Sequence, residues 1–506
     1  MVTRSVILHC NADLERGMGH LMRALCLAEE ATSRGWDVTI AGEFGGRAVE
    51  HVAALFPGQE IVELGDGPLQ LALSTLLAER SADLLHLDTY DEALDSFRPP
   101  SVLTSNMQDG MFGRRPADLH IDANLDAEHR YSAISQSDRV LLGSSVVQVR
   151  REMRAIHHEV GERPTRAPRV LVVLGGTDPF NITPQVVLAL LKHPRIHLTV
   201  ICRPEAQPEL LRSLGADAHR VKMLSFTNDL PRLADSMDAV ISAAGTSVWD
   251  FASAGIPMAI VAVTENQLPG YSSCAQHGIG FPLGTPPFTG LEDSIGAFLA
   301  SVEDPGYLRD SAERGRSAID GLGAWRVVSA WEALVQGTGE QTPPIRHPQL
   351  RARRALASDA GRLFEWRNDS STRAVSRSHK PIAWDEHVTW MGRVLADEHR
   401  QLLIIEHGDE PVATVRWDRL GDSAWEASIT IAPSYRGKGL GKSVLATGEH
   451  WFANSSPKLL LATVHRSNAA SRRLFLGAHY LPHLPADSNG FETLAKWQLP
   501  SDHSSS

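Results

Sequence analysis

The chain has 506 residues, too many for one hydrophobic core, and this length predicts about three structural domains. Its apolar fraction of 42% and charged fraction of 22% are those of an ordinary globular protein, and the net charge of −11 excludes a global basic field for nucleic acid or an anionic membrane surface. Its four cysteines have no metal or redox spacing, the first residues indicate a strand rather than a signal peptide, and no apolar run approaches the roughly 20 residues of a membrane span, so we expect a cytoplasmic protein.

The first segment alternates short apolar runs with amphipathic helical patterns. It predicts strands at 6–10, 37–41, 84–88 and 139–142 and a helix at 21–34. Strands that alternate with helices indicate a parallel sheet covered on both faces. Basic and polar residues from 151 to 168, with two prolines, indicate a hinge, so we place the first domain at 1–160 and a second at 161–335.

The second segment repeats this architecture. Strands are predicted at 169–174, 196–201, 239–242 and 258–262, followed by a long helix that ends near Val335. Two doubly wound units joined by a hinge place a ligand cleft at the carboxyl ends of their strands.

Residues 336–349 are polar, rich in glycine and proline and without a period, which is typical of a linker. Beyond it the pattern becomes α+β. We expect a domain at 350–500 with strands at 401–407, 411–418, 426–432 and 458–465, and helices that begin at Gly441 and Asn468. The tail, 501–506, is expected to be disordered.

The first candidate site is the loop between the first strand and the first helix. It reads Gly17-Met-Gly19-His20, and its glycines let the backbone approach a ligand at a helix start that offers free N–H groups. A histidine there tends to be neutral, the form that a general base or a water-positioning group needs. The alternative is a histidine that only caps its own helix.

Three further loops in the second segment follow strands and open helices or turns. The loop at 175–178 has two glycines, a hydroxyl and a carboxylate, which suit a diphosphate or a sugar. The loop at 245–250 offers a phosphate site, with a carboxylate for ribose hydroxyls one turn into the helix. The third loop ends in two amide side chains at 266–267. Capped strand-to-helix turns are the alternative for each. The candidate ligand-binding residues are Gly176, Thr177 and Asp178, then Gly245, Thr246, Ser247 and Asp250, then Asn266 and Gln267.

Over residues 4–335 these motifs, with Asp88-Thr-Tyr90, resemble the nucleotide-sugar hydrolase of pseudaminic acid biosynthesis, a GT-B-fold relative of glycosyltransferases. The resemblance implies release of UDP from a 2,4-diacetamido-2,4,6-trideoxy sugar by water attack at the anomeric carbon, without a metal. It implies that His20 is catalytic and that Asp88 and Tyr90 bind substrate. Where the family has arginine and aspartate before the loop, this chain has His9 and Asn11, and Asn11 is taken as substrate-binding.

A second candidate site follows an alternating strand late in the chain. The loop matches the pyrophosphate loop of GNAT acetyltransferases, in which glycine backbone N–H groups bind acetyl-CoA at a helix start. A glycine-rich surface turn is the alternative. The expected cofactor-binding residues are Ile431, Arg436, Gly437, Lys438, Gly439, Leu440, Gly441 and Asn468.

Upstream of this loop, Arg367 and His387 lie in a region that resembles the acetyltransferase of the same pathway, and both are expected to bind substrate. Many GNAT enzymes place a tyrosine, the acid that protonates the departing thiolate, where this chain has Phe475, so Tyr480, another group or water is expected to replace it. Glu426 is the candidate base for an amine nucleophile, with a solvated charge at a strand start as the alternative.

Taken together, these motifs predict a bifunctional enzyme: a GT-B-like pair of Rossmann-type domains followed by an α+β GNAT domain. Acetyl-CoA would acetylate a UDP-4-amino-4,6-dideoxy sugar, and the first part would then release UDP. The expected partners are a UDP sugar and acetyl-CoA, without metal, nucleic acid or membrane. Three alternatives remain: a glycosyltransferase in the first part, a different amine acceptor for the second, and a nonenzymatic sensor or scaffold. Oligomeric state is not predicted.

Overall fold

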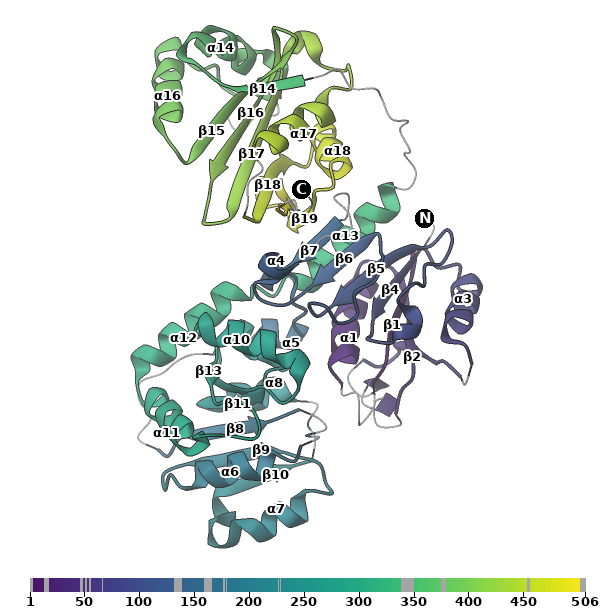
Figure 1. Cartoon of the computed structure of the whole chain (residues 1–506), viewed down its shortest axis with the longest axis vertical. Helices are drawn as coiled ribbons and strands as arrows, with labels where there is room; N and C mark the ends of the chain where they lie inside the picture. Colours follow the sequence, from purple (N-terminus) through teal and green to yellow (C-terminus); the bar gives the residue numbers. More distant parts are fainter. Residues whose placement is uncertain are drawn as a thin grey trace, which may run out of the picture. The chain divides into compact units, whose positions relative to one another are not determined.

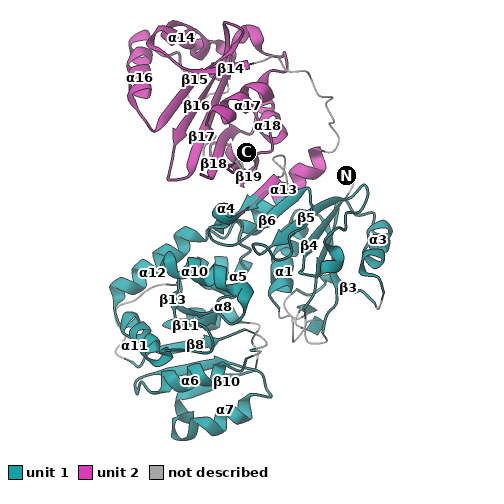
Figure 2. Cartoon of the chain, viewed as in Figure 1, with its two compact units in different colours: residues 1–130, 141–328 teal, residues 131–140, 329–506 magenta. Residues whose placement is uncertain are grey.

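The structure is a computed structural model that describes residues 3–12, 18–45, 49–50, 52–53, 56–65, 67–131, 139–158, 166–175, 178, 180–225, 227, 229–337, 350–374, 379–452 and 456–500 (Figure 1). The chain divides into two compact units, residues 1–130 with 141–328, and residues 131–140 with 329–506 (Figure 2). The predictions made for Gly17, Gly176, Thr177, most of the linker (338–349) and the tail (501–506) lie outside the described residues.

Unit 1 begins with a sheet of order β3-β2-β1-β4-β5-β6-β7. Neighbouring strands from β3 to β6 pair in parallel. The strands are β1 (Ser5–Cys10), β2 (Asp37–Gly42), β3 (Glu60–Glu63), β4 (Leu84–Asp88), β5 (Leu103–Gln108), β6 (Leu119–Asp122) and β7 (Arg139–Leu142). Every residue of β1 and β4 is buried, as expected for central strands of a sheet covered on both faces.

Helices α1 (Gly19–Ser33) and α3 (Leu69–Glu79) flank this sheet (Figure 1). The apolar positions of α3 pack with side chains of β1 and β4 in one core cluster. Shorter helical segments are η1 (Glu92–Leu94), α4 (Ala127–Arg130), η2 (Ser144–Val146) and α5 (Arg151–Arg154). The strand order reverses between β1 and β4, and the carboxyl ends of strands at such a point are where α/β sheets bind ligands.

The second sheet of unit 1 has the order β10-β9-β8-β11-β12-β13, with all neighbours parallel and the same reversal between β8 and β11. Its strands are β8 (Arg169–Val173), β9 (His197–Ile201), β10 (Val221–Leu224), β11 (Ala239–Ala243), β12 (Met258–Val261) and β13 (Phe281–Pro282). The helices between and after these strands are α6 (Thr183–Leu191), α7 (Gln207–Leu214), η3 (Gly215–Arg220), α8 (Leu230–Asp235), α9 (Ser247–Ala254), η4 (Glu265–Gln267), α10 (Leu268–Gln276), α11 (Leu291–Val302) and α12 (Pro305–Ala318). Helix α13 (Gly323–Gly337) follows them, and its residues from Ser329 on belong to unit 2.

Unit 2 has a sheet of order β14-β15-β16-β17-β18-β20-β19. The strands are β14 (Leu350–Arg354), β15 (Arg400–His407), β16 (Glu410–Arg419), β17 (Ala424–Ile431), β18 (Lys458–His465), β19 (Leu481–Leu484) and β20 (Phe491–Gln498). The helices are η5 (Ala357–Asp359), α14 (Ala360–Asn368), α15 (Ser370–Ala374), α16 (Trp384–Ala396), η6 (Pro433–Tyr435), α17 (Gly441–Phe452) and α18 (Ala469–Gly477). All neighbours pair antiparallel except β17 and β18, which are parallel.

The parallel pair β17–β18 separates along its length. The two strands pair only from Ala424 with Leu459 to Glu426 with Leu461. Beyond this point β17 still pairs with β16 and β18 still pairs with β20. In this described part of the sheet, the facing edges of 427–431 and 462–465 therefore lack a strand partner, and their backbone groups are open to a ligand.

Candidate functional sites

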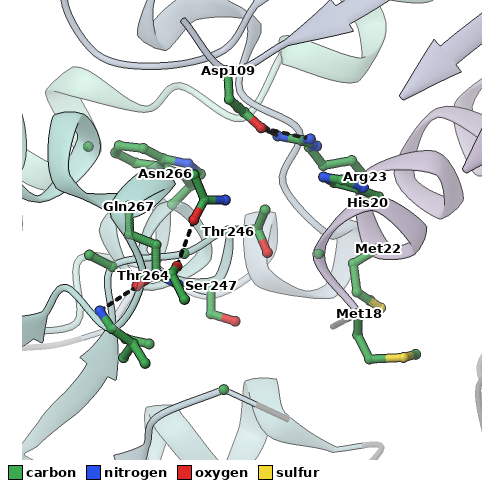
Figure 3. Close-up of a pocket in the computed structure, with 18 of the residues that line it drawn as sticks. Met18, His20, Met22, Arg23, Asp109, Thr246, Ser247, Thr264, Asn266 and Gln267 are labelled. Carbon is green, nitrogen blue, oxygen red and sulfur yellow. Dashed lines mark hydrogen bonds and ion pairs between the residues drawn. The ribbon is translucent and has the colours of Figure 1, made fainter. Parts of the chain in front are cut away.

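Unit 1 contains a cavity of about 730 Å³ at the carboxyl ends of its two parallel sheets. One wall follows β1, β4 and β5, and the other follows β8, β11 and β12. Figure 3 shows His20 and Arg23 together on α1, with Thr246, Asn266 and Gln267 on the other wall. The predicted ligand-binding residues that line the cavity are Asn11, Gly19, His20, Tyr90, Gly245, Thr246, Ser247, Asn266 and Gln267.

Two helix N-termini meet at this cavity. Helix α1 begins at Gly19 and α9 at Ser247, and a Cβ built on Gly19 would lie 3.6 Å from the Thr246 Cγ2 atom. Neither N-cap residue, Met18 or Thr246, makes a side-chain cap hydrogen bond. In α9 the N–H groups of Val248 and Trp249 already donate to the carbonyl oxygens of Gly245 and Thr246, both at 3.2 Å. The positive end of each helix dipole nevertheless lies at the cavity and favours an anion there.

The guanidinium of Arg23 organises the wall that belongs to the first sheet. It donates to Asp88 at 2.6 and 2.9 Å and to Asp109 at 2.9 and 3.1 Å. Asp109 also accepts from the Tyr90 hydroxyl and, at 3.2 Å, from Asn124. Burial alone would raise the pKa of Asp109, but the charge of Arg23 and these hydrogen bonds lower its pKa to about 2. Asp109 is therefore ionised and fully hydrogen-bonded.

His20 lies against this network. Its ring packs edge-on to Tyr90, with ring centroids 4.7 Å apart. Burial lowers the pKa of His20, partly opposed by the negative charges of Asp88 and Asp109. The imidazole is consequently neutral at pH 7, the state in which it accepts a proton.

Three carboxylates predicted to bind substrate are held by the protein instead. Asp88 is paired with Arg23 and does not line the cavity. Asp178 accepts from the backbone N–H groups of Ile182 (2.9 Å) and Thr183 (3.0 Å), so it closes the N-terminus of α6. These placements contradict the predicted substrate contacts, because a carboxylate that already satisfies buried donors cannot turn to a ligand without leaving them unpaired.

Asp250 is the third carboxylate that was predicted to bind substrate and is held by the protein instead. It accepts from the backbone N–H of Arg150 at 3.0 Å and from its Nε at 2.8 Å, and it too lies outside the cavity lining. The predicted contact between Asp250 and a ribose is therefore wrong in this structure. The buried ion pair instead joins the segment before α5 to helix α9.

Unit 2 contains a cavity of about 640 Å³ where β17 and β18 separate. Among its lining residues are Arg367, His387, Glu426 and Asn468, all of which were predicted site residues. The Thr463 hydroxyl on β18 donates to Glu426 Oε1 at 2.6 Å, which orients the carboxylate across the separating strands. Asn468 caps α18, since its side-chain oxygen accepts from Ser471 N–H at 3.1 Å.

His387 has a defined tautomer in this cavity wall. It is 2% exposed, and its Nε2 lies 3.0 Å from the carbonyl oxygen of Ala360. A carbonyl only accepts, so Nε2 carries the proton and Nδ1 carries a lone pair. Burial lowers the pKa of His387, which keeps the ring neutral. His387 is therefore a neutral ring whose buried Nδ1 has no hydrogen-bond partner among the described residues.

Tyr480, the predicted replacement acid, does not reach the cavity. It is 0% exposed in the core beneath the sheet, where its ring packs on Phe475 with centroids 5.0 Å apart. Burial and the neighbouring Glu449 carboxylate raise the pKa of Tyr480 well above its ordinary value. Phe475 lines the cavity and Tyr480 lies behind it, so the prediction of a catalytic Tyr480 is wrong for this geometry.

The glycine loop after β17 has the backbone that its sequence requires. Gly437 and Gly439 have φ angles of +72° and +75°, a left-handed conformation that side chains disfavour. Arg436 leaves the loop to contact α15, donating to Asp369 at 2.6 Å and Thr372 at 2.5 Å. Hydrogen bonds from Ser371 and from Arg436 hold the pKa of Asp369 well below its usual range. Ile431 and the loop 436–441 are not among the residues that line the 640 Å³ cavity.

Sequence reasoning missed several polar residues of these sites, among them Asp109, Asn124 and Thr463. Asp109 and Asn124 follow β5 and β6, strands without a clear apolar pattern, and Thr463 lies inside a strand. For Asp109 and Asn124 the one available signal is position, because each follows the carboxyl end of a parallel strand of the first sheet.

Comparison with known families divides the chain in the same way. Residues 170–268 match the model of the glycosyltransferase family 28 C-terminal domain. Residues 361–478 match the model of the acetyltransferase (GNAT) family. The predicted fold class is confirmed: a GT-B-like pair of Rossmann-type domains is followed by a GNAT acetyltransferase domain.

Individual relatives are distant. The spore coat polysaccharide biosynthesis protein SpsG of Bacillus subtilis is 27% identical over 172 residues, 33% of this chain, and the chain spans only 50% of that relative. An uncharacterized protein of Methanocaldococcus jannaschii, MJ1062, is 22% identical over 375 residues, 71% of this chain and 72% of the relative. The N-acetyltransferase PseH of Campylobacter jejuni, solved with acetyl coenzyme A, covers 30% of this chain and 99% of its own at 15% identity, with a TM-score of 0.25.

The chain thus combines a segment that matches a glycosyltransferase family 28 C-terminal domain with a segment that matches the acetyltransferase (GNAT) family. Within the described ranges, no group of three or more His, Cys, Asp or Glu residues is placed to hold a metal ion. The helices described for this chain include none long and apolar enough to cross a membrane.

Proposed function

We propose that the chain is a bifunctional cytoplasmic enzyme that acetylates a UDP-linked 4-amino-4,6-dideoxy sugar and hydrolyses the acetylated product to UDP and the free 2,4-diacetamido-2,4,6-trideoxy sugar, as in pseudaminic acid biosynthesis. The observation that carries the hydrolase activity is the unit 1 cavity, in which two helix N-termini without side-chain caps lie beside the neutral His20. The role of the Bacillus relative in spore coat polysaccharide biosynthesis supports a polysaccharide-sugar substrate. The four free, buried cysteines suit a reducing compartment.

In the hydrolase site, the N-termini of α1 and α9 bind the diphosphate. Water attacks the anomeric carbon while the bond from that carbon to the diphosphate oxygen breaks, and UDP leaves with the electron pair. His20 accepts the proton of the attacking water. Arg23, held by Asp88 and Asp109, fixes the cavity wall and is not free to pair with the phosphates.

In the acetyltransferase site, the separated edges of β17 and β18 receive the amide groups of acetyl-CoA, and the Gly437–Gly439 turn receives its pyrophosphate. The sugar amine attacks the thioester carbonyl, a C–N bond forms and the C–S bond breaks. Glu426 accepts the amine proton. Because Phe475 has no proton to give and Tyr480 is buried behind it, water protonates the thiolate.

A mass-resolved assay with the UDP-4-amino sugar and acetyl-CoA tests both activities in the full chain. We expect the wild type to produce UDP and free diacetamido sugar. His20→Ala removes the proton acceptor and is expected to slow UDP release by 10²–10⁴-fold, so that acetylated UDP-sugar accumulates. Gly439→Trp places a bulky side chain at a left-handed glycine and is expected to abolish acetylation.

His20→Ala is the control for the acetyltransferase site, because its acetylation should stay at the wild-type rate. Gly439→Trp is the control for the hydrolase site when it is given the acetylated UDP sugar directly, from which it should release UDP at the wild-type rate. UDP release at the wild-type rate in His20→Ala would show that His20 is not the catalytic group. Absence of acetylation by the wild type with any amino sugar would reject the proposed acceptor.

The family model over residues 170–268 favours a second candidate, a glycosyltransferase that uses an acceptor hydroxyl in place of water. The two are separated by incubating the wild type with the acetylated nucleotide sugar alone. A hydrolase releases UDP under these conditions, and a transferase releases it only when an acceptor is added.

A further inference from the structure

The contact between Thr463 and Glu426 joins the two strands that form the unit 2 cavity. Backbone pairing of β17 with β18 ends at Glu426 and Leu461. Thr463 lies two residues further along β18, on the same face as Leu461, because side chains alternate along a strand. Its hydroxyl donates to Glu426 Oε1 at 2.6 Å. This side-chain hydrogen bond therefore connects the strands just beyond the point where their backbone pairing stops.

Thr463 is held in place by the strand on its other side. β18 pairs with β20 from Lys458 to His465, and Thr463 lies directly opposite Thr493. Its chain neighbours Ala462 and Val464 are buried in the core of unit 2. A threonine is branched at Cβ, so its χ1 angle is restricted as well. The hydroxyl is therefore presented from a fixed backbone by a stiff side chain.

The side chain of Glu426 has more freedom of its own, because a glutamate rotates about three bonds and loses this freedom only through contacts. Both Glu426 and Thr463 line the cavity. As a proton acceptor Glu426 is a carboxylate, which only accepts hydrogen bonds, so the proton in this contact belongs to Thr463. The separation of 2.6 Å lies in the range of about 2.5–2.7 Å for a hydroxyl that donates to a carboxylate, a bond roughly twice as strong as a neutral one.

We propose that Thr463 is a positioning residue of the acetyltransferase site, and that it holds the Glu426 carboxylate where the proton of the attacking amine is accepted. This inference rests on the proposed function, in which Glu426 is that acceptor, and deepens it. The transfer itself is unchanged: the C–N bond forms, the C–S bond breaks, the amine proton passes to Glu426, and Thr463 keeps its own proton. Because misplacement by about 1 Å can cost on the order of 10²-fold in rate, loss of the hydroxyl should slow turnover and leave binding intact.

The test measures acetylation of the UDP-4-amino sugar by the full chain, with kcat and KM determined separately. Thr463→Val keeps the shape of the side chain and removes the hydroxyl. It is expected to lower kcat by about 10- to 100-fold, with KM for both substrates within about twofold of wild type. Thr463→Ser retains a hydroxyl and should stay within about threefold of the wild-type kcat. Thr493→Val is the matched control, since it is the same substitution opposite Thr463 and outside the cavity lining, and it should keep the wild-type kcat.

A double-mutant cycle separates positioning from a merely structural role. Glu426→Gln removes the proton acceptor and should lower kcat by about 10²–10⁴-fold. Since Thr463 acts through Glu426, adding Thr463→Val to Glu426→Gln should change kcat by less than about twofold. A Thr463→Val loss of equal size in both backgrounds would overturn the inference, and so would a Thr463→Ser variant as slow as Thr463→Val.

Failure of the inference and failure of the proposed function have different signatures. A slow Glu426→Gln variant beside a Thr463→Val variant that keeps the wild-type kcat overturns the inference alone. A wild-type kcat in Glu426→Gln shows that Glu426 is not the proton acceptor, and the proposed mechanism then fails together with the inference. Urea midpoints of unit 2 identify any loss that comes from unfolding, and Thr463→Ala, which also lacks the hydroxyl, takes the place of Thr463→Val if that variant does not fold.

Discussion

Two buried histidines lie on neighbouring central strands of the first sheet, His9 on β1 and His86 on β4. Their Nδ1 atoms contact the Ala41 carbonyl oxygen at 3.0 Å and the Ser105 hydroxyl at 3.1 Å. Burial lowers the pKa of each to about 4, from an ordinary value of 6.5. Both are therefore neutral in the native protein at pH values where the unfolded chain is protonated.

This difference predicts a pH dependence of stability. A histidine whose pKa is lowered by folding contributes its full stabilisation above pH 6.5. This stabilisation is lost as the pH falls toward 4, because the unfolded state binds the proton first. For His9 alone the free energy of unfolding should fall by about 2 kcal/mol between pH 7.5 and pH 5.0. The control is His9→Asn, whose amide keeps the contact to Ala41. Urea unfolding of unit 1 at both pH values should show a smaller loss for the variant, and an equal loss would contradict the pKa assignment.

At the scale of elements, the helix N-termini of unit 1 have different uses. Helices α1 and α9 open into the cavity without side-chain caps, whereas the carboxylate of Asp178 occupies the N-terminus of α6. An internal carboxylate satisfies the free N–H groups that an external anion would otherwise bind. The same strand-turn-helix arrangement thus leaves two helix N-termini at the cavity without a side-chain cap and gives a third a stabilising cap.

Removal of the α6 cap is accordingly predicted to affect stability and not turnover. Asp178→Ala should lower the free energy of unfolding by about 1 kcal/mol, since two backbone N–H groups lose their acceptor. Asp178→Asn, which retains one acceptor oxygen and tolerates the positive φ of 36°, should lower it less. The kcat/KM for UDP release should stay within twofold of wild type in both. A tenfold fall in kcat/KM in a stably folded Asp178→Asn variant would return Asp178 to the substrate site.

At the scale of the whole molecule, two compact units each contain one candidate site. The unit 1 cavity is lined from both parallel sheets, while the unit 2 cavity depends on one sheet whose central strands separate. Each site is built from residues of its own unit, so ligands are expected to stabilise the units separately.

This independence is measurable by thermal unfolding of the full chain. We predict two transitions, one for each unit. UDP should raise the free energy of unfolding of unit 1 alone, and acetyl-CoA that of unit 2 alone, each by about 2.7 kcal/mol at 100 times its Kd. Arg150→Met leaves the buried Asp250 carboxylate without its charged partner and should lower the free energy of unfolding of unit 1 by about 3–5 kcal/mol. The transition that this variant moves to lower temperature is therefore that of unit 1. A single transition raised by both ligands would show that the units unfold together.

Local patterns in the amino-acid sequence determined the strands with continuous or alternating apolar residues and the loops after them. The strands predicted at 6–10, 84–88, 169–174 and 458–465 correspond to β1, β4, β8 and β18. The left-handed backbone at Gly437 and Gly439 was also predictable, because a glycine-rich loop before a helix has few other structures. By contrast β5, whose buried residues include Thr104, Ser105 and Asn106, has no apolar signal, so its loop with Asp109 went unpredicted.

The tertiary structure alone decided what each polar side chain contacts. Asp88, Asp178 and Asp250 have the residue type and spacing of ligand-binding groups, but Arg23, the N-terminus of α6 and Arg150 satisfy them. Tyr480 has the chemistry of a general acid, and packing buries it behind Phe475. Conversely, the oxygen of Asn11 is occupied by Glu43, distant in sequence, so among the described residues only its amide N–H groups are without a partner. A residue's chemistry is local, but its availability depends on the partners that folding brings to it, and these are remote along the chain.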